Sequence, residues 1–205
     1  MANPEFGFRM IGVSDTSNHQ SPIVRVHMPD PNNLSPFIGQ FIGRVNAPRD
    51  STTPIYLEGL GVFDISTAVL GHMAVYFSDP NSMGRLVCHD FGRDFLLKRD
   101  PHHKSDMNAT PMVDTPMPID IRQRPPRMND VIGMPRKTDY RRGVHTSIVA
   151  TKPVPGVAQL LVSKLSTSQA IVVHNWQQIH DMLPEMSDNT YTRIVGYADT
   201  GRIIL

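Results

Sequence analysis

The stretch that decides the fold is residues 146–165, TSIVATKPVPGVAQLLVSKL. Two aliphatic runs, Ser147–Ala150 and Ala158–Leu165, flank a segment with two prolines and a glycine, Lys152–Gly156. β-Branched residues favour strands, whereas Pro and Gly favour turns. The stretch therefore predicts two consecutive strands that are joined by a turn.

The segment that follows predicts a short helix. Its apolar residues recur at intervals of three or four, which is the spacing of one helix face; they are Trp176, Ile179, Met182 and Leu183. Asn175 can cap the start of this helix, and Pro184 limits its end.

The end of the chain predicts a strand pair around a turn. Ile194–Tyr197 has the composition of a strand, Asp199–Gly201 that of a turn, and Arg202–Leu205 that of a returning strand.

Three features therefore follow one another, namely Pro155–Gly156 before an apolar strand, Trp176 in a short helix, and Asp199–Arg202 between two strands. In this order they resemble the outer protruding domain of calicivirus major capsid proteins, noroviruses in particular. Ser35–Val45 and Ser66–Asp79 are similar to two further strands of that domain. The resemblance implies a structural protein at the virion surface, made in the host cytoplasm. It also implies a homodimer that contacts other capsid subunits and attaches to a host receptor or glycan. It transfers no residues for sugar contact.

The first half of the chain has the spacing of a β protein. Short apolar runs recur every 8 to 12 residues between Ser35 and Phe77, which is typical of barrels and sandwiches. A hairpin is expected from Val75 to Phe91, with Pro80–Asn81 at its tip.

We divide the chain into an N-terminal arm or edge strand, residues 1–34, and a single β-rich domain, residues 35–205. The arm carries one alternating run, Ile23–Met28. Seven prolines without a regular period predict mostly extended loop at about residues 98–142. The fold class is mainly β, a barrel or sandwich with one short helix near residues 175–183.

Basic residues gather in that loop, where Asp130 and Asp139 alone oppose Arg122, Arg124, Arg127, Arg136, Lys137, Arg141 and Arg142. The whole chain, by contrast, has 20 basic and 19 acidic residues and a formal charge of +1. Such a run can bind RNA phosphates or an acidic partner, although only Tyr140 offers a stacking ring. RNA or acidic-partner binding by an accessory protein is our alternative function. A solvated loop without a ligand is the other interpretation.

Trp176 also has two interpretations. It can anchor an interface, where tryptophan contributes strongly to affinity. We favour the second interpretation, a core-facing residue of its helix, because its apolar partners share one stripe.

No motif favours catalysis, so we expect no enzyme and no cofactor. Nucleophile-elbow and phosphate-loop patterns are absent, and Cys88 has the surroundings of a small core residue. His102, His103 and Asp106 are metal-ligand types at a spacing that fits no metal signature, and we interpret them as part of a solvated loop. A metal-dependent hydrolase is our third hypothesis.

Cysteine usage and hydropathy concern the compartment. One cysteine excludes an intrachain disulfide, and no apolar run approaches the ~18 residues of a membrane span. The N-terminus lacks the pattern of a signal peptide. We therefore expect a soluble, non-secreted protein without membrane insertion.

Overall fold

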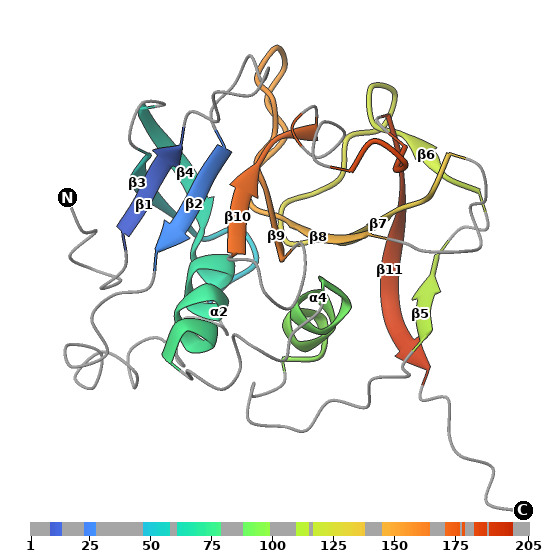
Figure 1. Ribbon diagram of the computed structural model, residues 1–205, viewed down its shortest axis with the longest axis horizontal. Coiled ribbons are helices and arrows are strands. Elements are labelled where there is room, and N and C mark those ends of the chain that lie inside the picture. The colour runs from blue at the N-terminus through green and yellow to red at the C-terminus, as the bar shows by residue number, and fades with distance from the viewer. Residues whose placement is uncertain are drawn as a thin grey trace, which may run out of the picture.

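The computed structural model describes residues 9–13, 23–27, 47–57, 61–78, 88–98, 110–114, 117–137, 145–164, 171–176, 178, 183–187 and 189–198. This part of the chain is mainly β, which confirms the predicted fold class. A large antiparallel sheet forms its centre, and two helices lie together on one side of that sheet (Figure 1).

The described strands are β1 (Arg9–Val13), β2 (Ile23–His27), β3 (Thr52–Leu57), β4 (Gly61–Ser66), β5 (Thr110–Val113), β6 (Ile119–Asp120), β7 (Val131–Met134), β8 (His145–Val149), β9 (Leu161–Lys164), β10 (Ile171–His174) and β11 (Thr190–Ala198). The large sheet has the order β1-β2-β10-β9-β8-β7-β11-β5, and β6 also pairs with β11. β3 and β4 form a separate hairpin.

The strand pair predicted at the centre is confirmed. β8 and β9 are antiparallel neighbours, with Ile148 opposite Val162. In the connection between them the Val157 N–H donates to the Val154 carbonyl over 3.1 Å. Gly156 has φ 76°, the left-handed conformation that the third position of a type II turn requires. The Pro-Gly pair therefore forms a tight turn, as its sequence predicts.

Helix α2, Thr67–Ser78, replaces a strand that the apolar run Ser66–Asp79 predicted. Ser66 caps it, because its Oγ accepts a hydrogen bond from the Val69 N–H at 3.2 Å. Residues 68–73 are all buried, so this part of the helix has no side that faces solvent. Such a helix lacks the one-sided period that separates helices from buried strands in sequence, which explains the error.

Helix α4, Cys88–Leu97, overturns the predicted hairpin from Val75 to Phe91, since both expected arms lie in helices. The tip, Pro80–Asn81, is outside the described residues. Phe91 and Phe95, one helical turn apart, are both buried in the core between the helices and the sheet. Cys88, expected within a strand, is the first residue of α4.

Gly92 allows α4 to approach the sheet closely. A Cβ at this position would overlap Cγ2 of Thr146 on β8 and lie 3.1 Å from Cγ1 of Val131 on β7. The helix therefore packs closely against β7 and β8.

The two faces of the sheet have separate cores. The core on the helical face combines α2, α4, the β3–β4 hairpin and sheet residues, among them Val131, Ile148, Val162, Val173 and Ile194. The core on the opposite face contains Ile132, Met134, Val149, Leu161, Trp176, Met186 and Tyr191. Both sides of β7 to β10 are therefore buried.

Three other expectations have different outcomes. The segment predicted as mostly extended loop, residues 98–142, contains the short strands β5, β6 and β7 among its described residues, and β7 is fully buried. Ile23–Met28 does supply a strand, β2, which pairs with β10 and with β1. The closing turn Asp199–Gly201, the strand Arg202–Leu205 and the run Ser35–Val45 lie outside the described residues.

The start of the helix expected near residues 175–183 is described. Asn175 Oδ1 accepts from the Gln178 N–H at 2.9 Å, and Gln178 Oε1 accepts from the Asn175 N–H at 2.7 Å. This reciprocal pair is a capping box, so the predicted role of Asn175 is confirmed.

Candidate functional site

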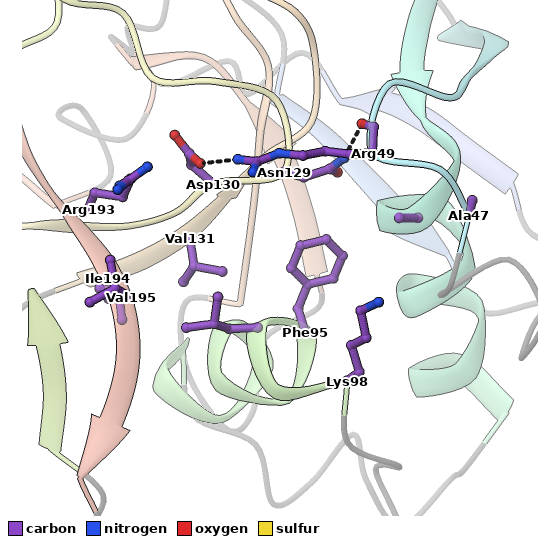
Figure 2. A pocket seen from close by; sticks show the side chains of 12 residues that line it. Ala47, Arg49, Phe95, Lys98, Asn129, Asp130, Val131, Arg193, Ile194 and Val195 are labelled. Carbon is purple, nitrogen blue, oxygen red and sulfur yellow. Dashed lines mark hydrogen bonds and ion pairs between the residues drawn. The ribbon is translucent and has the colours of Figure 1, made fainter. Parts of the chain in front are cut away.

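A cleft of about 410 Å³ lies between α4, β11 and the turn before β7 (Figure 2). Its apolar lining consists of Ala47, Ala68, Phe95, Leu96, Val131, Ile194 and Val195. Figure 2 shows Phe95 rising from α4 toward the cleft, with Asp130 and Arg49 on the opposite wall. Three cations also line it, namely Arg49, Lys98 and Arg193.

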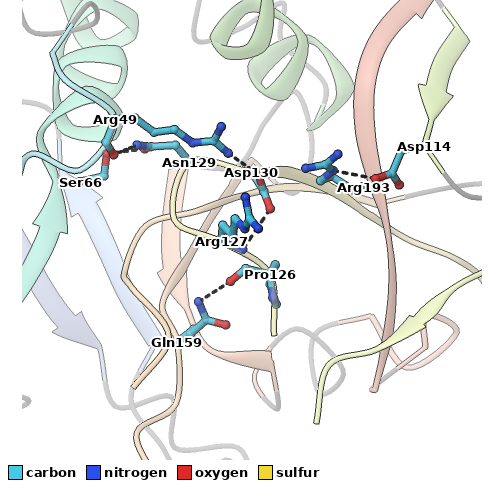
Figure 3. Close-up of polar contacts among 9 residues, drawn as sticks. All are labelled: Arg49, Ser66, Asp114, Pro126, Arg127, Asn129, Asp130, Gln159 and Arg193. Atoms are coloured by element: carbon cyan, nitrogen blue, oxygen red, sulfur yellow. Dashed lines mark hydrogen bonds and ion pairs between the residues drawn. The ribbon is translucent and has the colours of Figure 1, made fainter. Parts of the chain in front are cut away.

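Asp130 is the polar centre of this wall and is only 7% exposed. Its Oδ1 accepts from Arg49 Nη2 at 3.0 Å, and its Oδ2 accepts from the Arg127 backbone N–H at 3.0 Å (Figure 3). A buried carboxylate is stable only when such donors replace water. The carboxylate thus fixes the direction of the Arg49 guanidinium, whose side chain remains 60% exposed.

Asn129 attaches this turn to the segment before β3. It has φ 72°, a left-handed conformation that Asn tolerates better than most residues. Its Nδ2 donates to the Arg49 carbonyl at 2.7 Å, and its Oδ1 accepts from Ser66 Oγ at 2.5 Å. The cap of α2 and the position of Arg49 are therefore linked through one amide (Figure 3).

A second hollow of about 440 Å³ shares Arg49 with the cleft; its other lining residues are Asp50, Arg127, Met128, Lys152 and Pro153. We call the cations of the two hollows the basic band, which consists of Arg49, Lys98, Arg127, Lys152 and Arg193. Two carboxylates, Asp50 and Asp130, lie among these five cations. With Asp114, which pairs with Arg193, counted as a third carboxylate, the local formal charge is +2, larger than the +1 of the whole chain.

Two cations of the band, Arg193 and Lys98, differ in their partners. Arg193 Nε donates to Asp114 Oδ2 at 2.8 Å, which joins β11 to the end of β5. Lys98 ends α4 with φ 51°, and its ammonium makes no ion pair with any residue that the structure describes. A carboxylate therefore partly neutralises the band at Arg193, while Lys98 has no carboxylate partner among the described residues.

The predicted basic residues separate in space, and only Arg127 belongs to the band. Arg122 makes a two-pronged contact with Asp120, at 3.1 Å from Nε and 3.0 Å from Nη2, and these bonds hold the pKa of Asp120 below its ordinary value. Arg124 and Arg136 are exposed elsewhere, and Arg141 and Arg142 are outside the described residues.

Sequence reasoning missed four members of the band, because they come from separate segments; these are Arg49, Lys98, Lys152 and Arg193. A run of charge in sequence indicates a local patch, whereas this band depends on the tertiary fold. No one-dimensional signal identifies it.

Trp176 lies in the core, as we favoured. Its side chain is 8% exposed, and its ring centroid is 6.0 Å from that of Tyr191. Tyr191 in turn donates its hydroxyl hydrogen bond to the Arg124 carbonyl at 3.1 Å. Burial of the ring raises the pKa of Tyr191.

A serine–histidine contact occurs inside the sheet. Ser163 Oγ is 2.6 Å from His174 Nε2 and 2.5 Å from Ser147 Oγ, while His174 Nδ1 is 2.9 Å from the Asn175 carbonyl. The Nδ1 proton therefore donates to that carbonyl, and Ser163 donates to Nε2. All three side chains are buried, so this chain of hydrogen bonds connects strands and is closed to a substrate. Burial lowers the pKa of His174 to about 4.

Within the described ranges, no group of three His, Cys, Asp or Glu side chains is placed to hold a metal ion. The predicted candidates His102, His103 and Asp106 are outside those ranges. No helix of the described segments has the length and apolar character needed to cross a membrane.

No family model, curated protein or solved structure matches the chain. The resemblance to calicivirus capsid proteins therefore stays a prediction.

Proposed function

We propose that the protein binds RNA through the phosphate backbone and that the basic band is the contact surface. The observation that carries this proposal is the convergence of five cations on two adjoining hollows. Phosphate contacts from Arg and Lys supply most of the affinity in sequence-independent binding. A local charge of +2 in a chain whose total charge is +1 gives RNA phosphates one defined contact surface.

The arrangement of Arg49 supports contact with a phosphate. Asp130 engages one edge of its guanidinium, and the side chain still presents its other N–H groups to solvent. A guanidinium that is already oriented loses less conformational entropy when it binds an anion. Charge-assisted hydrogen bonds to phosphate oxygens are among the strongest that a protein makes.

The chemistry of the band favours a nucleic acid over an acidic protein. Protein interfaces have an apolar centre with aromatic anchors. Phe95 is the one aromatic residue lining the two hollows, and it is buried. Interfaces with nucleic acid are more polar and more positively charged. With no exposed ring for stacking, the contact would be to the backbone and would not depend on base sequence.

The test is fluorescence anisotropy of a labelled single-stranded RNA with a double variant, Arg127→Gln/Lys152→Gln. Neither side chain is buried, so the fold should be retained. Loss of two phosphate contacts should weaken binding at least about tenfold at low salt. The matched control is Arg136→Gln/Lys137→Gln, which removes the same charge from exposed residues outside the band. Equal loss in both variants would reject the band as the site.

A second candidate function, self-association as a coat-like structural protein, is favoured by the edge at β5. Strand β5 ends the order of the sheet. Exposed apolar side chains gather around it, and they are Met112, Val113, Met117 and Val195. The register between β5 and β11 skips Val195, so this residue occupies a bulge. An apolar edge strand can pair with a second copy of the chain.

Light scattering over a concentration series tests this second candidate. The native chain is expected to dimerise, and Val113→Lys should make it monomeric, since a charged edge strand resists pairing. A native protein that stays monomeric at every concentration would rule out self-association.

A further inference from the structure

A hollow of about 780 Å³, larger than either hollow of the basic band, lies beside the core on the sheet face opposite the helices. We call it the Trp176 hollow, and it is lined by Ile121, Arg122, Pro125, Pro153, Val154, Pro155, Gly156, Val157, Ala158, Gln159, Asn175, Trp176 and Asn189. Its volume is in the range of sites that bind small ligands or short segments of chain.

The walls of the Trp176 hollow are apolar and rigid. Three prolines contribute, and proline fixes φ of its own residue. Val154 and Val157 are largely exposed, and their backbones are held together by the turn around Gly156. Such a wall offers apolar contact to a ligand without a loss of conformational freedom on binding.

Gln159 supplies a fixed acceptor in this hollow. Its side chain is only 7% exposed, and its Nε2 donates to the carbonyls of Pro126 at 3.0 Å and Thr151 at 3.1 Å. Since both partners are acceptors, the amide nitrogen must face them, and this defines the place of Oε1. Oε1 accepts no hydrogen bond from any described residue. Because Oε1 is open to the hollow and no described residue uses it, it can accept a hydrogen bond from a donor on a ligand.

Asn175 and Trp176 supply two donors. The capping box fixes Asn175 with Oδ1 on the backbone of the helix, so its Nδ2 is the remaining polar group. Neither Asn175 Nδ2 nor the indole Nε1–H of Trp176 donates to a residue within the described part of the chain. Both groups are held in place by packing or by the cap.

The hollow is nearly uncharged. Among the described residues that line it, Arg122 is the one ionised side chain, and its two-pronged contact with Asp120 offsets its charge. These residues offer an ionic ligand no uncompensated opposite charge. This distinguishes the Trp176 hollow from the basic band.

We propose that the Trp176 hollow binds an extended, uncharged peptide segment through one main-chain carbonyl and one main-chain N–H. The peptide carbonyl accepts from Asn175 Nδ2 and Trp176 Nε1, and the peptide N–H donates to Gln159 Oε1. A carbonyl oxygen has two lone pairs and an N–H one proton, so two donors and one acceptor suit one carbonyl and one N–H of an extended main chain. Apolar side chains of the segment then pack on the proline and valine wall. A sugar would instead require an open aromatic face, whereas Trp176 is almost wholly covered.

The test uses the blocked peptide acetyl-Ala-Val-Ala-Val-Ala-amide as probe. Trp176 is the sole tryptophan of the chain, so its fluorescence reports on this hollow alone. A saturable change in emission is expected. The same peptide with N-methylated backbone amides lacks the donor for Gln159 and should bind roughly tenfold more weakly, or not at all.

Two substitutions at Asn175 test the donor without loss of the cap. Asn175→Asp and Asn175→Ser both keep an oxygen for the Gln178 N–H, and both remove the amide N–H₂ group. Each should weaken peptide binding roughly tenfold, as measured by calorimetry, while Arg136→Gln leaves it unchanged.

The proposal is overturned if the peptide gives no saturable response, or if the N-methylated peptide binds equally well. Saturable binding of methyl glucoside in place of the peptide would also overturn it. None of these results depends on RNA binding, because the probe is uncharged.

Discussion

The basic band and the Trp176 hollow meet at Pro153, yet they present opposite chemistry. The band gathers full charges that remain largely hydrated, and its contacts are expected to be strong only at low salt. The hollow presents amide groups that other hydrogen bonds fix in place. Hydrated charges can bind the repeated phosphates of RNA without one fixed geometry. Neutral groups that are fixed in place favour a ligand with matching donors and acceptors, such as the proposed peptide.

Each region has its own buried histidine, and acid should act on both. His72 Nε2 lies 2.9 Å from the Phe91 carbonyl beneath the band, and its ring packs against Phe95. His174 adjoins Asn175 at the hollow. Burial lowers the pKa of each from 6.5 to about 4. Between these values the unfolded chain binds the protons that the folded chain excludes, so stability is complete above pH 6.5 and falls as pH drops toward 4.

The expected loss is roughly 3 kcal/mol for the two histidines together on going from pH 6.5 to about pH 5. Urea unfolding at a series of pH values measures it. His174→Asn should roughly halve the slope by removing one group. A free energy of unfolding that is constant over this range would contradict the burial of both rings.

Gly92→Ala should destabilise the helical face of the sheet, which carries the basic band, more than the opposite face, which carries the Trp176 hollow. Alanine favours helices over glycine by about 1 kcal/mol, but its Cβ would overlap Thr146. Overpacking costs about 1 to 3 kcal/mol, so we expect a net destabilisation of up to about 2 kcal/mol. Thermal unfolding measures the change. An Ala variant that is more stable than the native chain would show that α4 can move away from β8.

Ser66→Ala should have the smallest effect of the three, about 1 kcal/mol, because it removes the cap of α2. It also removes the contact to Asn129, which positions the Arg49 segment. We therefore expect weaker RNA binding together with unchanged peptide binding. Ser66→Thr, which retains a capping oxygen, is the control.

Local patterns and tertiary contacts explain what the sequence could and could not predict. The turn at Gly156 and the cap at Asn175 follow from residue chemistry within a few positions, and both were predicted. Helices α2 and α4 were not predicted. The sequence of α2 is mostly apolar and lacks a one-sided period, and the start of α4 belongs to an apolar run that also has the composition of a strand. Arg127 was identified as part of a charged run, but its neighbours Arg49 and Lys152 meet it only in the folded chain.

The hollow is a further example of this limit. Trp176 and Arg122 were both singled out in sequence, for different reasons, and they line the same space. Gln159 carried no signal at all. Its importance comes from the two carbonyls that fix its amide, and one of these, that of Pro126, is 33 residues away in the chain.

The most direct test of the central claim is the salt dependence of RNA affinity for the native chain and for Arg127→Gln/Lys152→Gln. Each phosphate contact to a single strand contributes about 0.7 to the slope of log affinity against log salt, so the variant should lose about 1.4. The Arg136→Gln/Lys137→Gln control should keep the native slope. Identical slopes for all three proteins, or no RNA binding by the native chain at low salt, would contradict a phosphate-binding role for the basic band.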